Sequence, residues 1–183
     1  MKTKANILLG VTGGIAAYKA CDLINMLRKQ DYDVRVIMTE HAKQFITPMT
    51  LSTLSRNPVM DDMWAERKGD VEHIDIGKWA DGLVLYPATF NIIGKFSSGI
   101  CDDLLSTVFQ AIPCDKKRII FPSMNNIMWE NKILQKNISL LKEVYGSEIR
   151  IVEPIDGRLA CGDVGKGKLV SPPKAVKEIV DFL

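Results

Sequence analysis

Short apolar runs alternate with helix-like segments along nearly the whole chain, and few folds accommodate such a pattern. Residues 6–11 form an apolar run followed by glycines, and residues 15–30 place apolar side chains at helical spacing. Further strand-like runs lie at 34–38, 83–86, 118–121 and, as the last strand expected, 149–152. Helices are expected over about 90–111, 125–145 and 172–182. The pattern predicts an α/β fold with a doubly wound, flavodoxin-like or Rossmann-like parallel sheet and helices on both faces.

The length and charge of the chain set the first limits. Its 183 residues fit a single domain over 1–183, and they can bury a core without disulfides or a structural metal. The net charge is only +2, and the Lys and Arg residues are scattered, so no nucleic-acid partner is expected. Residues 55–78 and 154–170 lack clear periodicity, and loops without a packing role often carry function.

The cysteines, the histidines and the N-terminal stretch suggest a cytoplasmic protein without a metal. The four cysteines form no C-x-x-C pair and are interpreted as free thiols in a reducing compartment. Only two histidines are present, so no metal site is expected. The apolar stretch 7–17 is interrupted by glycines and leads into a strand–turn–helix pattern, which argues against a secretory signal. No run approaches the roughly 18 apolar residues of a membrane span, so no membrane association is expected.

Small or polar residues follow the predicted strands at the point where each strand ends. These residues are the glycine-rich 10–14, Thr39, 87–91 and 122–125. Thr39 is also a candidate N-cap for a helix through Phe45. In open parallel sheets, ligands bind beyond the carboxyl ends of the strands. A nucleotide-like cofactor is therefore expected at this edge.

The glycine-rich segment Gly-Val-Thr-Gly-Gly-Ile at 10–15 lets the backbone approach a ligand closely. Its spacing is not G-x-G-x-x-G, and no acidic residue follows at the ribose-binding distance, so an NAD site has little support. A tight turn without a ligand remains the alternative. At the exit of residues 83–86, Thr89 and Asn91 can either bind a ligand or cap a helix.

Three further segments carry candidate chemistry. His73 can act as a base or hold an anion, and a surface histidine is the alternative. Asn125 or Asn126 can bind a carboxylate through the amide N–H groups. Cys161 lies in a glycine-rich stretch and can donate a proton or attack an electrophile. The side chains of Met124, Met128 and Trp129 can line a flat ring, although Trp129 is better explained as a core residue.

Taken together, these segments resemble the homo-oligomeric flavin-containing cysteine decarboxylases over nearly the whole chain. The resemblance rests on Gly13-Gly14-Ile15, His73 before Trp79, the strand exit 87–91, the stretch Gly-Ile-Cys-Asp-Asp-Leu-Leu at 99–105, and Pro-x-Met-Asn-x-x-Met-Trp at 122–129. One branch, the phosphopantothenoylcysteine decarboxylases, carries A-C-G-D-x-G-x-G, which stands here as 160–167 with Cys161. Peptidyl-cysteine decarboxylases are not expected to have that cysteine. A peptidyl-cysteine decarboxylase or a non-catalytic regulatory flavoprotein is the alternative.

The resemblance implies FMN as cofactor and loss of CO₂ from a cysteinyl carboxylate. Oxidised FMN would take a hydride from the carbon bearing sulfur, and return of the hydride and a proton would complete the reaction. His73 and Cys161 would be catalytic, and Asn125 and Met128 would contact the substrate. The residues implied in FMN binding are Gly13, Gly14, Ile15, Thr39, Ala88, Thr89, Phe90, Asn91 and Ser123.

The chain departs from the family at one strand exit, where the usual Pro-Ala-Ser-Ala-Asn-Thr reads Pro-Ala-Thr-Phe-Asn-Ile at 87–92. Phe90 and Ile92 therefore alter the finer flavin contacts. The chain also lacks the ligase domain of the fused enzymes, so decarboxylation alone is expected. The family further implies trimers, with FMN between subunits, that assemble into larger shells such as dodecamers.

Overall fold

The computed structural model describes residues 3–64 and 72–183, without the side chains of residues 72 and 73. Six parallel strands form one sheet with the order β3-β2-β1-β4-β5-β6. They are β1 (Asn6–Val11), β2 (Asp33–Met38), β3 (Val59–Met60), β4 (Gly82–Ala88), β5 (Lys117–Pro122) and β6 (Ile149–Ile151). This is the Rossmann order, and it confirms the doubly wound parallel sheet. The strand order reverses between β1 and β4, which is where such sheets bind ligands.

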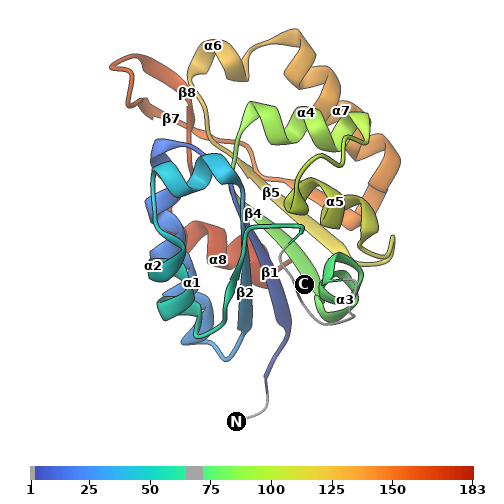
Figure 1. The fold of residues 1–183 in the computed structure, drawn as a ribbon. Helices are drawn as coiled ribbons and strands as arrows, with labels where there is room; N and C mark the ends of the chain where they lie inside the picture. The colour runs from blue at the N-terminus through green and yellow to red at the C-terminus, as the bar shows by residue number, and fades with distance from the viewer. Residues whose placement is uncertain (1–2, 65–71) are drawn as a thin grey trace.

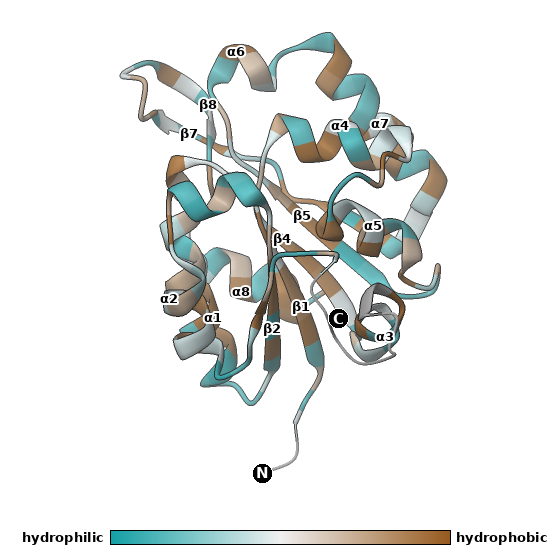
Figure 2. Ribbon diagram, viewed as in Figure 1, coloured by the Kyte–Doolittle hydropathy of each residue, from teal (hydrophilic) through white to brown (hydrophobic). Residues whose placement is uncertain are grey.

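Helices cover both faces of the sheet (Figure 1). One face is covered by α1 (Ala20–Arg28), α2 (Pro48–Ser55) and α8 (Pro172–Val180), and the other by α3 (Glu72–Trp79), α4 (Phe90–Ser98), α5 (Leu104–Ala111) and α7 (Lys132–Tyr145). Successive residues of a strand point to opposite faces, so Leu9 packs in the first core and Leu8 in the second. Both faces are apolar, as the brown strands of Figure 2 show, and this explains why the strands could be recognised as continuous apolar runs.

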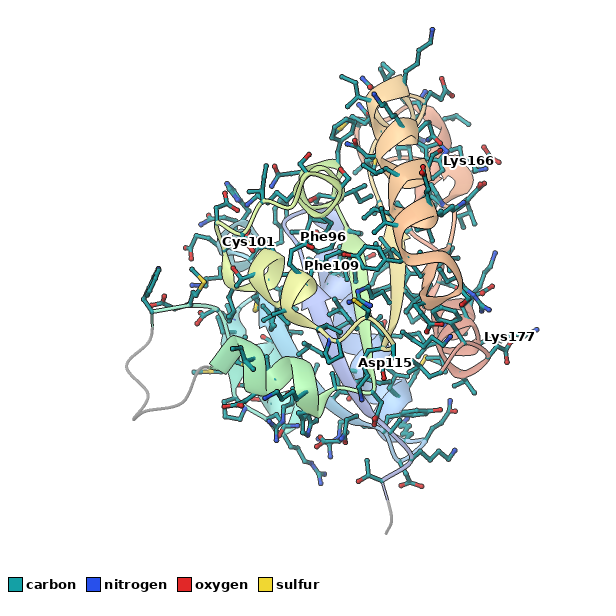
Figure 3. All side chains as sticks on the ribbon, turned by 90° about the vertical axis from the view of Figure 1, so that its right-hand side faces the viewer. Phe96, Cys101, Phe109, Asp115, Lys166 and Lys177 are labelled. Carbon is teal, nitrogen blue, oxygen red and sulfur yellow. The ribbon has the colours of Figure 1, made fainter. Side chains whose placement is uncertain are left out.

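Aromatic packing joins α4 to α5 in the second core. The rings of Phe96 and Phe109 stack with centroids 3.7 Å apart and an interplanar angle of 5° (Figure 3). The Tyr145 ring of α7 meets Phe109 edge-on. This packing holds α4, which begins at the exit of β4, in a fixed position.

The expected helices exist but are divided. Residues 90–111 form α4 and α5, because Gly99 ends α4 in a left-handed conformation and Asp103 caps α5. Residues 125–145 form the short α6 (Asn126–Trp129) and α7, with Asn131 capping α7. Residues 15–30 begin with the 3₁₀ turn η1 (Ile15–Lys19) before α1. Thr39 is the N-cap residue of the 3₁₀ turn η2 (Glu40–Gln44), as predicted, but its side chain makes no capping hydrogen bond.

The expectation that 149–152 is the last strand was wrong. Residues 154–170 contain an antiparallel hairpin of β7 (Ile155–Arg158) and β8 (Val164–Lys168). Much of this hairpin is exposed and four of its residues are glycines, so its sequence lacks the apolar alternation of a packed strand. Figure 1 shows the hairpin beyond the carboxyl ends of the central strands, beside α6.

Two further properties follow from the described residues. All four cysteines are free thiols, as expected. Among the helices of 3–64 and 72–183, none has the length and apolar character needed to cross a membrane.

Candidate functional site

Two adjoining cavities open at the carboxyl ends of the central strands. Their volumes are about 450 Å³ and about 530 Å³. Gly13, Thr89, Phe90 and Met128 line both cavities. The cavities therefore lie at the exits of β1 and β4, where the strand order reverses.

The glycine-rich turn after β1 is tied to the exit of β4. The Thr12 hydroxyl donates to the Pro87 carbonyl oxygen at 2.8 Å and accepts from the Thr89 N–H at 3.2 Å. A Cβ on Gly13 would lie 2.5 Å from the Cβ of His41, so packing requires glycine there. A Cβ on Gly14 would meet nothing within 4 Å, and Gly14 lines the first cavity with Ile15. The turn thus leaves an open floor beside the cavity.

The exit of β4 supplies both a helix cap and cavity residues. The Thr89 hydroxyl caps α4 by accepting from the Ile92 N–H at 3.4 Å, which agrees with the capping interpretation, and Thr89 also lines both cavities. Asn91 and Thr39 line the second cavity. Ala88 does not reach either cavity, because its side chain is fully buried in the core and its carbonyl accepts from the Ser123 N–H. Ser123 lines the first cavity.

The exit of β5 distinguishes the two neighbouring asparagines. Asn125 lines the first cavity, and its Oδ1 accepts a 2.7 Å hydrogen bond from the Met128 N–H. Asn126 instead packs beneath Gly165 in β8. Trp129 is only 7% exposed, which confirms it as a core residue, whereas Met128 is 41% exposed at the cavities. The geometry therefore favours Asn125 as the carboxylate-binding candidate.

The hairpin covers the first cavity and carries the thiol. Cys161 lines that cavity. The base of the hairpin rests on the β5 exit, since the Met124 N–H donates to the Gly167 carbonyl at 3.0 Å. Any Cβ on Gly167 would collide with the Met124 carbonyl oxygen. Cys161 and Asn125 thus face one cavity from two segments that are hydrogen-bonded to each other.

His73 is described only through its backbone. It lies in α3, which Figure 1 places toward the amino-terminal ends of the strands, away from the hairpin. The side chain of His73 lies outside the described residues. None of the described α3 side chains lines either cavity.

The sequence analysis missed three cationic side chains of the first cavity. Lys19 from η1, Arg158 from β7 and Lys168 from β8 all line it. Burial lowers the pKa of Lys19, and the charge of Lys168 lowers it further. No ion pair joins any of the three to a carboxylate within the described part of the chain. Like charges gathered in a cavity favour an anionic ligand.

The second cavity is lined by the charged residues Glu40, Lys95 and Asp103. Lys95 lies within 2.6 Å of both Asp102 Oδ1 and Asp103 Oδ2, and Lys95 and Asp103 line the cavity. His41 and Thr12 line it as well. The positions of His41 and Thr12 depend on turns of the chain that the sequence pattern did not predict.

A Rossmann-ordered sheet with cavities at its switch point is typical of nucleotide-binding α/β proteins. Within that class, the chain belongs to the Flavoprotein family, which matches residues 1–183.

The chain is similar in sequence to curated proteins over most of its length. The chain is 43% identical over 178 residues to a probable phosphopantothenoylcysteine decarboxylase of Streptococcus mutans, covering 97% of this chain and 98% of that protein. It is 41% identical to the coenzyme A biosynthesis bifunctional protein CoaBC of Borreliella burgdorferi, covering 99% of this chain and 45% of the relative. The chain thus spans less than half the length of that bifunctional relative.

Solved structures show the same fold. A PPC decarboxylase mutant complexed with pantothenoylaminoethenethiol superposes with a TM-score of 0.86 at 31% identity, covering 98% of each chain. The FMN-binding protein AtHal3 superposes with a TM-score of 0.83 at 31% identity, covering 98% of this chain and 96% of that one.

Proposed function

We propose that the chain is an FMN-dependent phosphopantothenoylcysteine decarboxylase, which converts 4′-phosphopantothenoylcysteine to 4′-phosphopantetheine in coenzyme A biosynthesis. The observation that carries the proposal is that Asn125 and Cys161 face one cavity, in a chain that matches the Streptococcus mutans relative over nearly the full length of both. An amide that binds a carboxylate and a thiol that donates a proton are two groups that this reaction needs from the protein.

The cavities fit a flavin. The open space at Gly14 admits a flat ring, and the half-buried Phe90 and the exposed Met128 offer apolar contact to its faces. Gly13, Ile15, Thr39, Thr89, Asn91 and Ser123 line the same space and would hold the remainder of FMN. FMN, when bound, accepts a hydride from the substrate and can return it. Ala88 would act only by shaping this strand exit.

Asn125 and Cys161 perform distinct tasks in the proposed reaction. Because Asn125 Oδ1 is occupied by the Met128 N–H, the Asn125 Nδ2 group is left to donate to the substrate carboxylate. The Cys161 thiol donates the proton that completes the saturated product. Met128 lines the substrate space beside them.

The cations of the first cavity suit the phosphoryl group of the substrate. Lys19 and Lys168 repel one another, and a dianionic phosphoryl group between them relieves that repulsion. Arg158 adds a planar donor set. This arrangement supports a phosphorylated small molecule as substrate.

We place His73 at the active site as a base or positioning group contributed by a second copy of the chain. The described side chains of α3 do not reach the cavities of their own chain, and Ile15 and Tyr18 are more than half exposed at the rim. The proposal therefore includes a homo-oligomer built from trimers, with FMN at the subunit interfaces. It also places the protein in the cytoplasm.

Product masses test this function. The purified protein is expected to be yellow and to release FMN on heating. With 4′-phosphopantothenoylcysteine, it should yield a product that has lost CO₂ alone. A product that has lost CO₂ and two hydrogens would instead indicate a peptidyl-cysteine decarboxylase type of reaction. A colourless protein that cannot be loaded with FMN would refute the proposal.

A further inference from the structure

The loop that joins β7 to β8 places a carboxylate against the Cys161 thiol. The loop is closed by hydrogen bonds from the Leu159 N–H to the Asp163 carbonyl at 2.8 Å and from the Gly162 N–H to the Leu159 carbonyl at 3.0 Å. Gly162 has a φ of +97°, which allows this tight turn. The Cys161 Sγ donates to Asp163 Oδ2 at 3.4 Å.

The two side chains occupy different positions relative to the cavity. Cys161 lines the first cavity, whereas Asp163 does not. No described ion pair involves Asp163, and the neighbouring Lys166 of β8 binds Glu153 instead. The carboxylate of Asp163 is thus available to the thiol without touching the substrate space.

We propose that Asp163 is a positioning residue, which holds Cys161 at the cavity as a protonated thiol and so keeps it ready as the proton donor. This inference rests on the proposed function and adds a residue to it. Only the protonated thiol can donate to the Asp163 carboxylate, and a thiolate there would face a like charge.

The charges around the cavity explain why such a group is needed. The cationic side chains of Lys19 from η1, Arg158 from β7 and Lys168 from β8 share the cavity with Cys161. Nearby positive charge favours the anionic form of an acid, and a thiolate has no proton to donate. Asp163 is the carboxylate in contact with the thiol, and it opposes these cations.

The proton balance defines when Asp163 acts. After CO₂ has left, rotation about the Cβ–Sγ bond of Cys161 turns the S–H group from Asp163 toward the cavity. The enethiolate carbon then takes the proton, so the S–H bond breaks and a C–H bond forms. Cys161 is left as a thiolate with one negative charge, next to the carboxylate of Asp163. The repulsion between the two anions then drives return of a proton from solvent water, to which both residues are exposed.

Alkylation of Cys161 tests the contact independently of catalysis. The rate of reaction with iodoacetamide at fixed neutral pH reports the thiolate fraction, and mass spectrometry of the Cys161 peptide measures it. Asp163→Asn and Asp163→Ala should each raise this rate about threefold, the effect of one exposed charge at contact distance. Asp156→Asn removes the same charge from exposed β7 and should leave the Cys161 rate unchanged. The alkylation rate of the exposed Cys114 should be the same in every variant. An unchanged Cys161 rate in the Asp163 variants, or a rise in the alanine variant alone, overturns the proposal.

Product partition in the FMN-loaded enzyme tests the consequence. With 4′-phosphopantothenoylcysteine, both neutral variants should still release CO₂ but form at least threefold more of the product that is two hydrogens lighter. Asp163→Glu keeps the charge and should restore the saturated product. Wild-type partition in Asp163→Asn overturns the role of Asp163. If the wild-type protein itself releases no CO₂, the proposed function fails, and the alkylation rates still decide the contact.

Discussion

The Oδ1 atom of Asn125 accepts a 2.7 Å hydrogen bond from the backbone N–H of Met128, and this bond fixes which end of the amide can meet a ligand. The oxygen caps α6, so the NH₂ group remains to donate two hydrogen bonds. A single side chain thus begins a helix and provides a donor at the first cavity. A cap and a binding group are usually alternative explanations of an asparagine, and here both apply.

Asn125→Asp separates these two roles. Aspartate caps a helix as well as asparagine does, so the free energy of unfolding should change little. The substrate carboxylate would meet a like charge in place of two donors, and KM should rise at least tenfold, because a hydrogen bond to a charged group contributes about 1.5–3 kcal/mol. Steady-state kinetics and urea unfolding measure the two effects.

Asn131→Asp is the matched control for that variant. Asn131 caps α7 by accepting from the Ile133 N–H at 2.9 Å, and it lines neither cavity. The control should leave both KM and stability near the wild-type values. An unchanged KM in Asn125→Asp would remove Asn125 from the substrate site.

Lys168→Gln tests whether the hairpin contributes to binding of the phosphoryl group. Removing this charge should raise KM for the phosphorylated substrate about tenfold, as expected for loss of one charged hydrogen bond, and should change KM for the dephosphorylated analogue much less. Lys166→Gln makes the same change on the same hairpin, but Lys166 binds Glu153 and lines neither cavity. Equal effects of Lys168→Gln on both substrates would contradict a phosphoryl contact.

Much of the sheet could be predicted because β1, β4 and β5 are covered on both faces and are therefore mainly apolar. The hairpin escaped prediction because its residues are largely exposed, so no packed face imposes a period on residues 155–168. Gly99 and Asn131 were the local signs of the two helix breaks, but helical periodicity alone continues across them.

The candidate site could be predicted only in part. Asn125 and Cys161 were recognised because each stands in a motif at a strand exit or in a glycine-rich stretch. Lys19 and Lys168 were missed because their proximity depends on how η1 and the hairpin meet around the cavity. The positions of these two lysines in the sequence give no indication that their side chains line one cavity.

The Lys95 ion-pair cluster predicts an acid-sensitive contribution to stability. The hydrogen bond from Lys95 lowers the pKa of Asp102. A lowered folded-state pKa contributes stability above the unfolded value, and this contribution disappears as pH falls through the folded value. Asp102 is largely exposed, so Asp102→Asn should cost less than about 1 kcal/mol at pH 7.

Urea unfolding at several pH values checks this contribution. The stability difference between wild type and Asp102→Asn should shrink as pH falls from about 5, past the unfolded-state pKa of about 4, and through the lower folded-state pKa, where the wild-type carboxylate becomes protonated. Burial lowers the pKa of Lys95, but its two carboxylate partners outweigh burial, so the net effect is a raised pKa of Lys95. Glu143→Gln, on an exposed helix position, should show no comparable trend. A difference that stays constant down to pH 3 would contradict the ion-pair explanation.

Gly167→Ala should displace the hairpin that carries Cys161 from the β5 exit that carries Asn125. The added Cβ collides with backbone, the Met124 carbonyl oxygen, which cannot rotate away as a flexible side chain would. The hydrogen bond from the Met124 N–H to Gly167 must then lengthen or break. The free energy of unfolding should fall by about 1–3 kcal/mol, as expected for such overpacking.

Gly94→Ala is the matched control, because Gly94 lies within α4 with only Asn137 Nδ2 near the added Cβ, at 3.9 Å. Alanine there should stabilise the fold by up to about 1 kcal/mol. Hydrogen exchange of residues 155–168 in both variants measures the displacement. Gly167→Ala should exchange faster, and only in the hairpin. It should also form more of the product that is two hydrogens lighter, because the thiol no longer reaches the intermediate. Wild-type exchange rates and a wild-type product ratio in Gly167→Ala would show that close packing at Gly167 does not set the distance between the thiol and the amide.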